Sequence, residues 1–290
     1  MLNDLCRPYD EALTKILSLG VKKISQRVGQ STRSLFGLQT RYDLSTNQLP
    51  VLTRRKFFPK SIFYELLWFL SGSTNNHDLE AYGSLIWRPW ESPKFEKQYG
   101  FVSGSLGPIY GFQLRNFGGD YGRGDKAQSE AGGEDQLAYM FDLLEKDPQS
   151  RRILFSLWNP KDLKTSRLPP CHYSYQVVVD DEKQLSGILT QRSCDYPIGC
   201  PANIFFYSLL TNMFAIKYGF RAKEFIHNCG EAHIYEDQIE GVKKYLSQEA
   251  FPSPTFQFDR TDDPFKTESY EEFSLINYQH SPHIRIPVAV

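Results

Sequence analysis

Several features are scarce or absent in this 290-residue sequence. It has only five cysteines, an odd number without regular spacing, and no apolar stretch that approaches the roughly 20 residues of a membrane span. Neither sign of charge dominates, because 33 basic residues oppose 34 acidic ones. These absences argue against a disulfide scaffold, a membrane-spanning chain and a protein that binds nucleic acid through its overall charge. The start of the sequence has no apolar signal segment, so we expect a soluble cytoplasmic protein.

The 40% of hydrophobic residues is enough for a substantial core. Helical periodicity predicts helices at residues 9–19 (with Gly20 as the C-cap), 61–70, 203–218 and 232–247. Alternating or β-branched runs predict strands at residues 35–44, 152–158, 173–179 and 184–192. A polar, glycine-rich surface loop is expected at residues 118–133. Because strands and helices do not alternate regularly, we predict a single α+β domain over residues 1–290, with a mixed β-sheet packed by helices.

The segment LPPCHYSYQ, residues 168–176, places Cys171 after two prolines and before a histidine. A thiol becomes a good nucleophile when nearby cations lower its pKa, and Arg151, Arg152 and Arg192 lie on or beside adjacent predicted strands. Cys171 is therefore a candidate nucleophile. Taken alone, a cysteine next to a histidine is more often a buried structural cysteine.

The segment QRSCDYPIGCPAN, residues 191–203, gathers polar groups around a Gly-Pro turn. Arg192 and Ser193 suit a phosphate, and the amide of Asn203 offers both a donor and an acceptor to the edge of a base. The alternative is that Asn203 only caps the helix that it opens.

Two further groups of residues have a functional and a structural interpretation. His233 and Tyr235 could both reach a sugar hydroxyl if the backbone between them is extended, although a lone pair of this kind is more often structural. Glu65 lies in an otherwise apolar helix, where its carboxylate must be paired, hydrated or protonated for proton transfer. Trp87 and Trp90 could form a wall for a flat heterocycle or belong to the core. No set of Cys and His has zinc spacing, so we predict no metal.

Eight segments together resemble the thymidylate synthase family, in the family's order and over nearly the whole chain. They are RVGQSTRSLFG, ELLWFLSGSTN, LGPIYGFQLRNFG, RRILFSLWNP, LPPCHYSYQ, QRSCDYPIGCPANI, HIYEDQIE and INYQHSPHIRIPVAV. The resemblance implies reductive methylation of deoxyuridylate (dUMP) to thymidylate (dTMP), with 5,10-methylenetetrahydrofolate as the donor of the one-carbon unit and of hydride. It also implies a homodimer, joined through a face of the sheet, with Arg151 and Arg152 reaching the partner's active site.

The resemblance carries roles over residue by residue. It makes Cys171 the thiolate that adds to C6 of the pyrimidine, and Asn203 the residue that contacts its O4 and N3 edge. Residues matched to the family's chemistry are Cys171, Glu65, Tyr110, His172 and Arg192. Residues matched to nucleotide binding are Arg27, Arg151, Arg152, Arg192, Ser193, Asp195, Asn203, His233 and Tyr235. Residues matched to the folate side are Trp87, Asp195, Gly199 and Ala289.

Three positions depart from the family pattern: Ala202 replaces a usual Phe, Arg88 a usual Asp and Leu114 a usual Trp. Loss of an apolar wall at position 202 could admit water, which keeps open the alternative of a dUMP or dCMP 5-hydroxymethylase that releases tetrahydrofolate. A cytosine-specific relative is expected to carry Asp at the Asn203 position, so Asn203 favours uracil. A non-catalytic relative would be expected to lack Cys171 or its arginines, and the sequence retains them.

Overall fold

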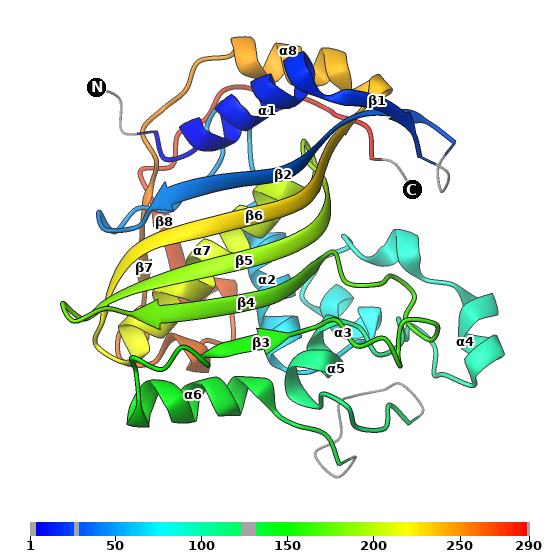
Figure 1. Cartoon of the computed structure of the whole chain (residues 1–290), viewed down its shortest axis with the longest axis vertical. Coiled ribbons are helices and arrows are strands. Elements are labelled where there is room, and N and C mark those ends of the chain that lie inside the picture. The colour runs from blue at the N-terminus through cyan, green and yellow to red at the C-terminus, as the bar shows by residue number, and fades with distance from the viewer. Residues whose placement is uncertain (1–3, 26–28, 123–131, 289–290) are drawn as a thin grey trace. The chain divides into compact units, whose positions relative to one another are not determined.

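The computed structural model describes residues 4–25, 29–122 and 132–288 (Figure 1). The chain forms two compact units. The first unit comprises Met1–Pro59 and Val179–Val290, and the second comprises Lys60–Val178. Within the described residues, no helix is long and apolar enough to cross a membrane.

A mixed sheet forms the centre of the first unit. Its strands lie in the order β1 (Val21–Ile24), β2 (Ser31–Asp43), β6 (Arg221–Tyr235) and β5 (Gln184–Asp195). Strand β2 is antiparallel to both β1 and β6, whereas β5 is parallel to β6. Buried and accessible residues alternate along β5, as expected for a strand with one face on the core. A smaller antiparallel pair is formed by β7 (Thr255–Phe258) and β8 (Phe273–Ile276).

Three helices complete the first unit: α1 (Arg7–Leu19), α7 (Gly199–Lys217) and α8 (Ile239–Ser247). Helix α7 is apolar on all sides and contacts β5 and β6, so it is a core helix of this unit. Helix α1 ends at Gly20, whose φ of −63° is not left-handed. A Cβ at Gly20 would lie 2.4 Å from the Ile16 carbonyl oxygen, so lack of space explains the glycine.

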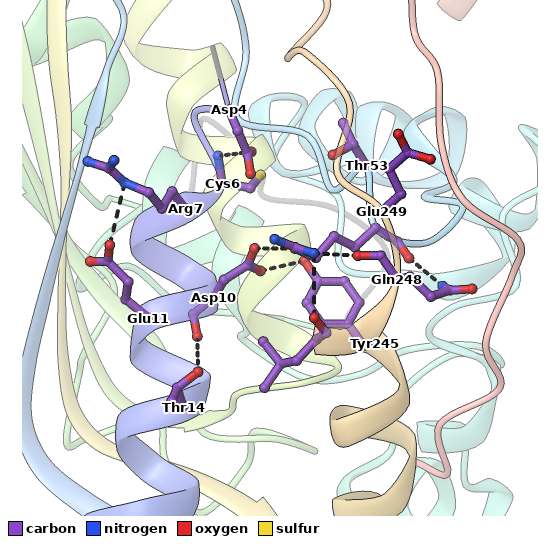
Figure 2. Close-up of polar contacts among 12 residues, drawn as sticks. Asp4, Cys6, Arg7, Asp10, Glu11, Thr14, Thr53, Tyr245, Gln248 and Glu249 are labelled. Carbon is purple, nitrogen blue, oxygen red and sulfur yellow. Dashed lines mark hydrogen bonds and ion pairs between the residues drawn. The ribbon is translucent and has the colours of Figure 1, made fainter. Parts of the chain in front are cut away.

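A polar cluster joins α1 to α8 (Figure 2). The Asp10 carboxylate accepts hydrogen bonds from the Tyr245 hydroxyl at 2.8 Å and from Arg54 Nε at 2.7 Å. Burial raises the pKa of Asp10, and these two hydrogen bonds oppose the increase. The guanidinium of Arg54 also donates to the carbonyl of Gln248, just beyond the end of α8. The cluster therefore holds α1 against α8 and the residue that follows it, Gln248.

The second unit is built mainly from short helices. They are α2 (Pro59–Leu70), α3 (Asn76–Ala81), α4 (Pro93–Tyr99), α5 (Tyr110–Arg115) and α6 (Gln136–Lys146). Strands β3 (Leu154–Ser156) and β4 (His172–Val179) pair antiparallel. Serine, asparagine and aspartate side chains cap α3, α4 and α6 by accepting backbone N–H bonds.

The predicted α+β class with a mixed sheet packed by helices is confirmed. The prediction of a helix at residues 232–247 is wrong at its start, because β6 continues to Tyr235 and α8 begins only at Ile239. Pairing of Ala232 with Leu35 on β2 and with Cys194 on β5 outweighs the local helical pattern. The single-domain organisation and the use of a sheet face for dimerisation stay predictions, and part of the loop at 118–133 lies outside the described residues.

Candidate active site

Cys171 lies in the second unit, immediately before β4. Its side chain is half-buried. The Cys171 N–H donates to the Tyr110 hydroxyl at 2.9 Å, and Tyr110 is the first residue of α5. Because Tyr110 is only 2% exposed, this hydrogen bond ties the backbone of the candidate nucleophile to a fixed point in the core of the unit.

Aromatic rings surround this anchor. The Tyr110 ring is nearly parallel to the rings of His172 and Phe69, with centroids 4.3 and 4.7 Å away. Trp87 approaches Tyr110 edge-on at 5.8 Å. Stacked and edge-to-face pairs at these separations are attractive, so the rings hold one another in place. We call Phe69, Trp87, Tyr110 and His172 the aromatic cluster.

Glu65, on α2, is bonded to this cluster. Its Oε1 accepts a hydrogen bond from Trp87 Nε1 at 2.6 Å. Burial raises the pKa of Glu65 to about 7, and the hydrogen bond from Trp87 partly opposes the increase. A carboxyl group that is half protonated near neutral pH can both give and take a proton, which suits proton transfer. Glu65 is thus a half-buried acid in a largely apolar helix, and its role in proton transfer stays a prediction.

In the first unit, the end of β5 and the start of α7 carry the residues predicted to bind the nucleotide. Asn203 Nδ2 donates to Gln191 Oε1 at 3.1 Å, and His227 Nε2 contacts the same oxygen at 2.9 Å. Gln191 Nε2 donates to the Ser193 carbonyl at 3.0 Å. These bonds determine which end of the Asn203 amide faces Gln191. We call Gln191, Asn203 and His227 the amide network.

His227 is 1% exposed, and burial lowers its pKa to about 4. It is therefore neutral at pH 7. Since Gln191 Oε1 can only accept, Nε2 carries the proton and Nδ1, 3.7 Å from Cys200 Sγ, is the acceptor. The sequence reasoning assigned no role to Gln191 or His227, since neither lies at a spacing that signals a site.

The interpretation of Asn203 as a helix cap is wrong, because α7 begins four residues earlier at Gly199. His233 and Tyr235 lie on β6 in the extended backbone that their predicted role requires. Their ring centroids are 5.2 Å apart with the planes nearly perpendicular. Strand geometry places residues two apart on the same face.

Asp195 ends β5, and the side-chain amide of Gln238 donates to its carboxylate. Gln238 Nε2 lies 3.1 and 3.0 Å from the two Asp195 oxygens and 3.0 Å from the Pro287 carbonyl oxygen. Burial raises the pKa of Asp195 to about 6, and the hydrogen bond from Gln238 opposes the increase. Gly199 is the first residue of α7. Arg27 and Ala289 lie outside the described residues.

Comparison with known proteins identifies the family. The family model described as thymidylate synthase matches residues 7–290. The chain belongs to the thymidylate synthase family. It is 41% identical to a thymidylate synthase of human herpesvirus 8 type P (isolate GK18), over 97% of this chain and 83% of the viral protein. It is also 39% identical to a bifunctional dihydrofolate reductase-thymidylate synthase of Leishmania amazonensis, over 98% of this chain but only 55% of that protein.

Membership of the thymidylate synthase family confirms the sequence resemblance and makes the chain a methyltransferase of dTMP biosynthesis. The names of these relatives do not favour the hydroxymethylase alternative. Family members use methylenetetrahydrofolate as a co-substrate. Within the part of the chain that the structure describes, no three His, Cys, Asp or Glu side chains gather in a metal-binding arrangement. The absence of a metal stays a prediction.

The departures from the family pattern have different surroundings. Arg88 Nε donates to Glu80 at 2.7 Å, and the arginine is largely exposed. Leu114 is buried in α5 and takes part in the core of the second unit. Ala202 is half-buried in the first turn of α7. Arg151 and Arg152 are exposed in the turn before β3, and the prediction that they lower the pKa of Cys171 stays untested.

Proposed function

We propose that the protein methylates dUMP at C5 to give dTMP, using 5,10-methylenetetrahydrofolate as the donor of both the one-carbon unit and hydride, through a covalent bond between Cys171 and C6. Family membership supports the overall reaction. The observation that carries the covalent step is the hydrogen bond from the Cys171 N–H to Tyr110, because it attaches the nucleophile to the aromatic cluster that also holds Glu65.

The first steps need an ionised thiol and a way to stabilise charge on the pyrimidine. When the Cys171 thiolate adds to C6, negative charge develops on O4 and C5 becomes nucleophilic. The amide of Asn203, fixed by Gln191, offers a donor to that oxygen. Since C5 must later lose a proton, the elevated pKa of Glu65 suits it to that transfer through an ordered water.

The later steps require that bulk water stay out. The folate co-substrate supplies a methylene carbon that bonds to C5 and then a hydride that reduces it to methyl. On elimination of the folate, C5 carries an electrophilic methylene group, which water would convert to hydroxymethyl. We assign Trp87, Asp195 and the C-terminal segment to the folate side, where they exclude water. Re-formation of the thiolate then releases Cys171 from C6.

We also propose a homodimer that works in the cytoplasm, with Arg151 and Arg152 reaching the partner's nucleotide. Their exposure in the isolated chain supports this role. Large apolar side chains on β1 and β2 are also exposed, including Phe36 at 88%. Such apolar surface commonly marks a contact with another protein. A mass of twice that of the chain in multi-angle light scattering is expected, and a monomer at assay concentration would contradict the proposal.

The experiment that tests the reaction is product identification with dUMP and methylenetetrahydrofolate. Mass spectrometry should detect dTMP, and absorbance should rise as the folate is oxidised to dihydrofolate in equal amount. Hydroxymethyl product without dihydrofolate would overturn the proposal. Denaturing the complex with a labelled nucleotide should preserve a covalent adduct, and peptide mapping should place the label on Cys171. This experiment tests the covalent step.

A further inference from the structure

One amide joins three parts of the first unit. Gln238 is 0% exposed and uses both ends of its side chain. Its Oε1 accepts from the Tyr235 N–H at 3.0 Å, while its Nε2 faces the Asp195 carboxylate and the Pro287 carbonyl. An NH₂ group has two protons, so one serves the carboxylate and the other the carbonyl. Both donors of this side chain are therefore in use.

A purely structural role accounts for only half of these contacts. The bond from the Tyr235 N–H to Gln238 Oε1 caps the 3-10 turn Glu236–Gln238, as a glutamine often does at a helix start. That role leaves the NH₂ group unexplained. Nε2 instead points to Asp195, at the end of β5, and to Pro287, 49 residues further along the chain.

The C-terminal segment lies against the first unit through a series of contacts. Ser281 bonds to Thr53 and Glu249, and Pro282 accepts from Gln248. Ile286 is 8% exposed and packs so closely on Gly241 of α8 that a Cβ there would lie 3.0 Å from it. In the described part of this segment, the bond from Gln238 to Pro287 is the polar contact nearest its end.

We infer that Gln238 is a positioning residue that couples the docked C-terminal segment to Asp195, so that each helps to hold the other in place. The inference rests on the proposed function, in which Asp195 and the C-terminal segment form the folate side and keep water out. Loss of the Gln238 donors should therefore weaken folate binding and let water compete with hydride, while the nucleotide remains bound.

The variant that tests this coupling is Gln238→Glu. It keeps an oxygen for the Tyr235 N–H but places a second carboxylate against Asp195 and an acceptor against the Pro287 carbonyl. Hydrogen bonds to charged groups are worth more than neutral ones, so we expect KM for methylenetetrahydrofolate to rise at least about tenfold. We further expect hydroxymethyl product to become detectable, and the dissociation constant for dUMP to change less than about threefold.

A matched control is Gln248→Leu. Gln248 is also an amide that binds the C-terminal segment, at Pro282, but it donates to the Arg54 carbonyl where Gln238 donates to Asp195. If any loosening of the segment caused the effect, Gln248→Leu would raise the folate KM and the hydroxymethyl fraction as much as Gln238→Glu. We expect both quantities to stay close to the wild-type values in Gln248→Leu.

A second measurement does not depend on turnover. Hydrogen exchange at Ile284–Val288 should be faster in Gln238→Glu, and also in Asp195→Ala, because Gln238 links Asp195 to that segment. Unchanged exchange in either variant, or an unchanged folate KM with only methyl product in Gln238→Glu, would overturn the coupling. Absence of dTMP with the wild-type protein would instead contradict the proposed function, and the exchange result would still decide on Gln238.

Discussion

The aromatic cluster of the second unit and the amide network of the first each hold one titratable group away from water, by different means. Glu65 accepts a hydrogen bond from the indole of Trp87, a member of the aromatic cluster. His227 lies in a chain of directional bonds through Gln191 to Asn203. In both, burial is the largest cause of the pKa shift, and it favours the neutral form.

The contrast relates the environment of each group to its task. A group that must exchange protons needs a pKa near neutral pH, and apolar rings provide this by removing water from the carboxylate. A group that must hold an amide in one orientation should not titrate at all near neutral pH, and His227 meets that condition with its lowered pKa. The aromatic cluster is thus suited to chemistry and the amide network to selection of the base.

The largest expected effect is loss of the nucleophile itself, which affects chemistry without disturbing either set of contacts. Cys171→Ser should reduce turnover by at least about 10,000-fold, because a serine hydroxyl is not ionised near neutral pH. The dissociation constant for dUMP, measured by calorimetry, should remain within a few-fold of wild type. Substantial residual turnover would refute the assignment of Cys171.

Removal of the titratable group from the aromatic cluster should have the next largest effect. Glu65→Gln retains an oxygen that can accept from Trp87 but cannot take up a proton. Loss of general acid–base catalysis typically lowers rates by about 100- to 10,000-fold, so we expect kcat to fall into that range. Steady-state kinetics across pH 6–8 provides the measurement. A variant with near wild-type kcat would show that Glu65 is only structural.

The two units should respond to pH with opposite signs. The folded pKa of His227 is about 4 against an ordinary 6.5, so between these values the unfolded chain binds more protons than the folded one. Stability should therefore fall as pH falls from 6.5 to 4, by a few kcal/mol at about 1.4 kcal/mol per pKa unit. Urea unfolding at several pH values measures this dependence. In His227→Gln, the free energy of unfolding should no longer fall between pH 6.5 and 4 by this amount.

Glu65 provides the matched comparison for that experiment. Its folded pKa is about 7 against an ordinary 4.5, so in this interval the folded chain binds more protons. The contribution of Glu65 to the free energy of unfolding is greatest below pH 4.5 and declines as pH rises through 7. Glu65→Gln should remove the fall in the free energy of unfolding between pH 4.5 and 7. The dependence that arises from His227 should remain unchanged. Equal flattening of both windows by either variant would contradict the separation of the two groups.

A smaller effect is expected from a change in base selection within the amide network. Asn203→Asp replaces a donor with an acceptor, which suits the amino group of cytosine better than O4 of uracil. We expect the ratio of kcat/KM for dUMP over dCMP to fall by about 10- to 100-fold, the range of one mispaired hydrogen-bonding group. An unchanged preference for uracil would count against the role of Asn203.

The sequence and the structure agree best where the evidence is local. Periodicity predicted α2, and an apolar helix with one acid pointed to Glu65. A β-rich run between turn signals predicted β5, and family segments pointed to Cys171 and Asn203, whose roles stay predictions. Position 232 was misassigned because the pairing of β6 with two neighbouring strands outweighs its local pattern.

Residues that act through other residues were missed for a physical reason. Gln191 meets His227, 36 positions further along the sequence, only because β5 and β6 pair. Gln238 meets Pro287 only because the C-terminal segment returns to α8. Glutamine has no distinctive spacing, and its role depends on which groups the fold brings to its two ends.

The smallest effect should come from removing one hydroxyl from the aromatic cluster. Tyr110→Phe loses the hydrogen bond to the Cys171 N–H but retains the ring that stacks on His172 and Phe69. One hydrogen bond is worth about 1 kcal/mol, so kcat should fall only about three- to tenfold. Tyr110→Leu, which also removes the stacked ring, should be clearly slower and less stable to heat. If the two variants are equally impaired, the hydroxyl and not the ring packing positions the nucleophile, and the contrast between the two units is smaller than the contacts indicate.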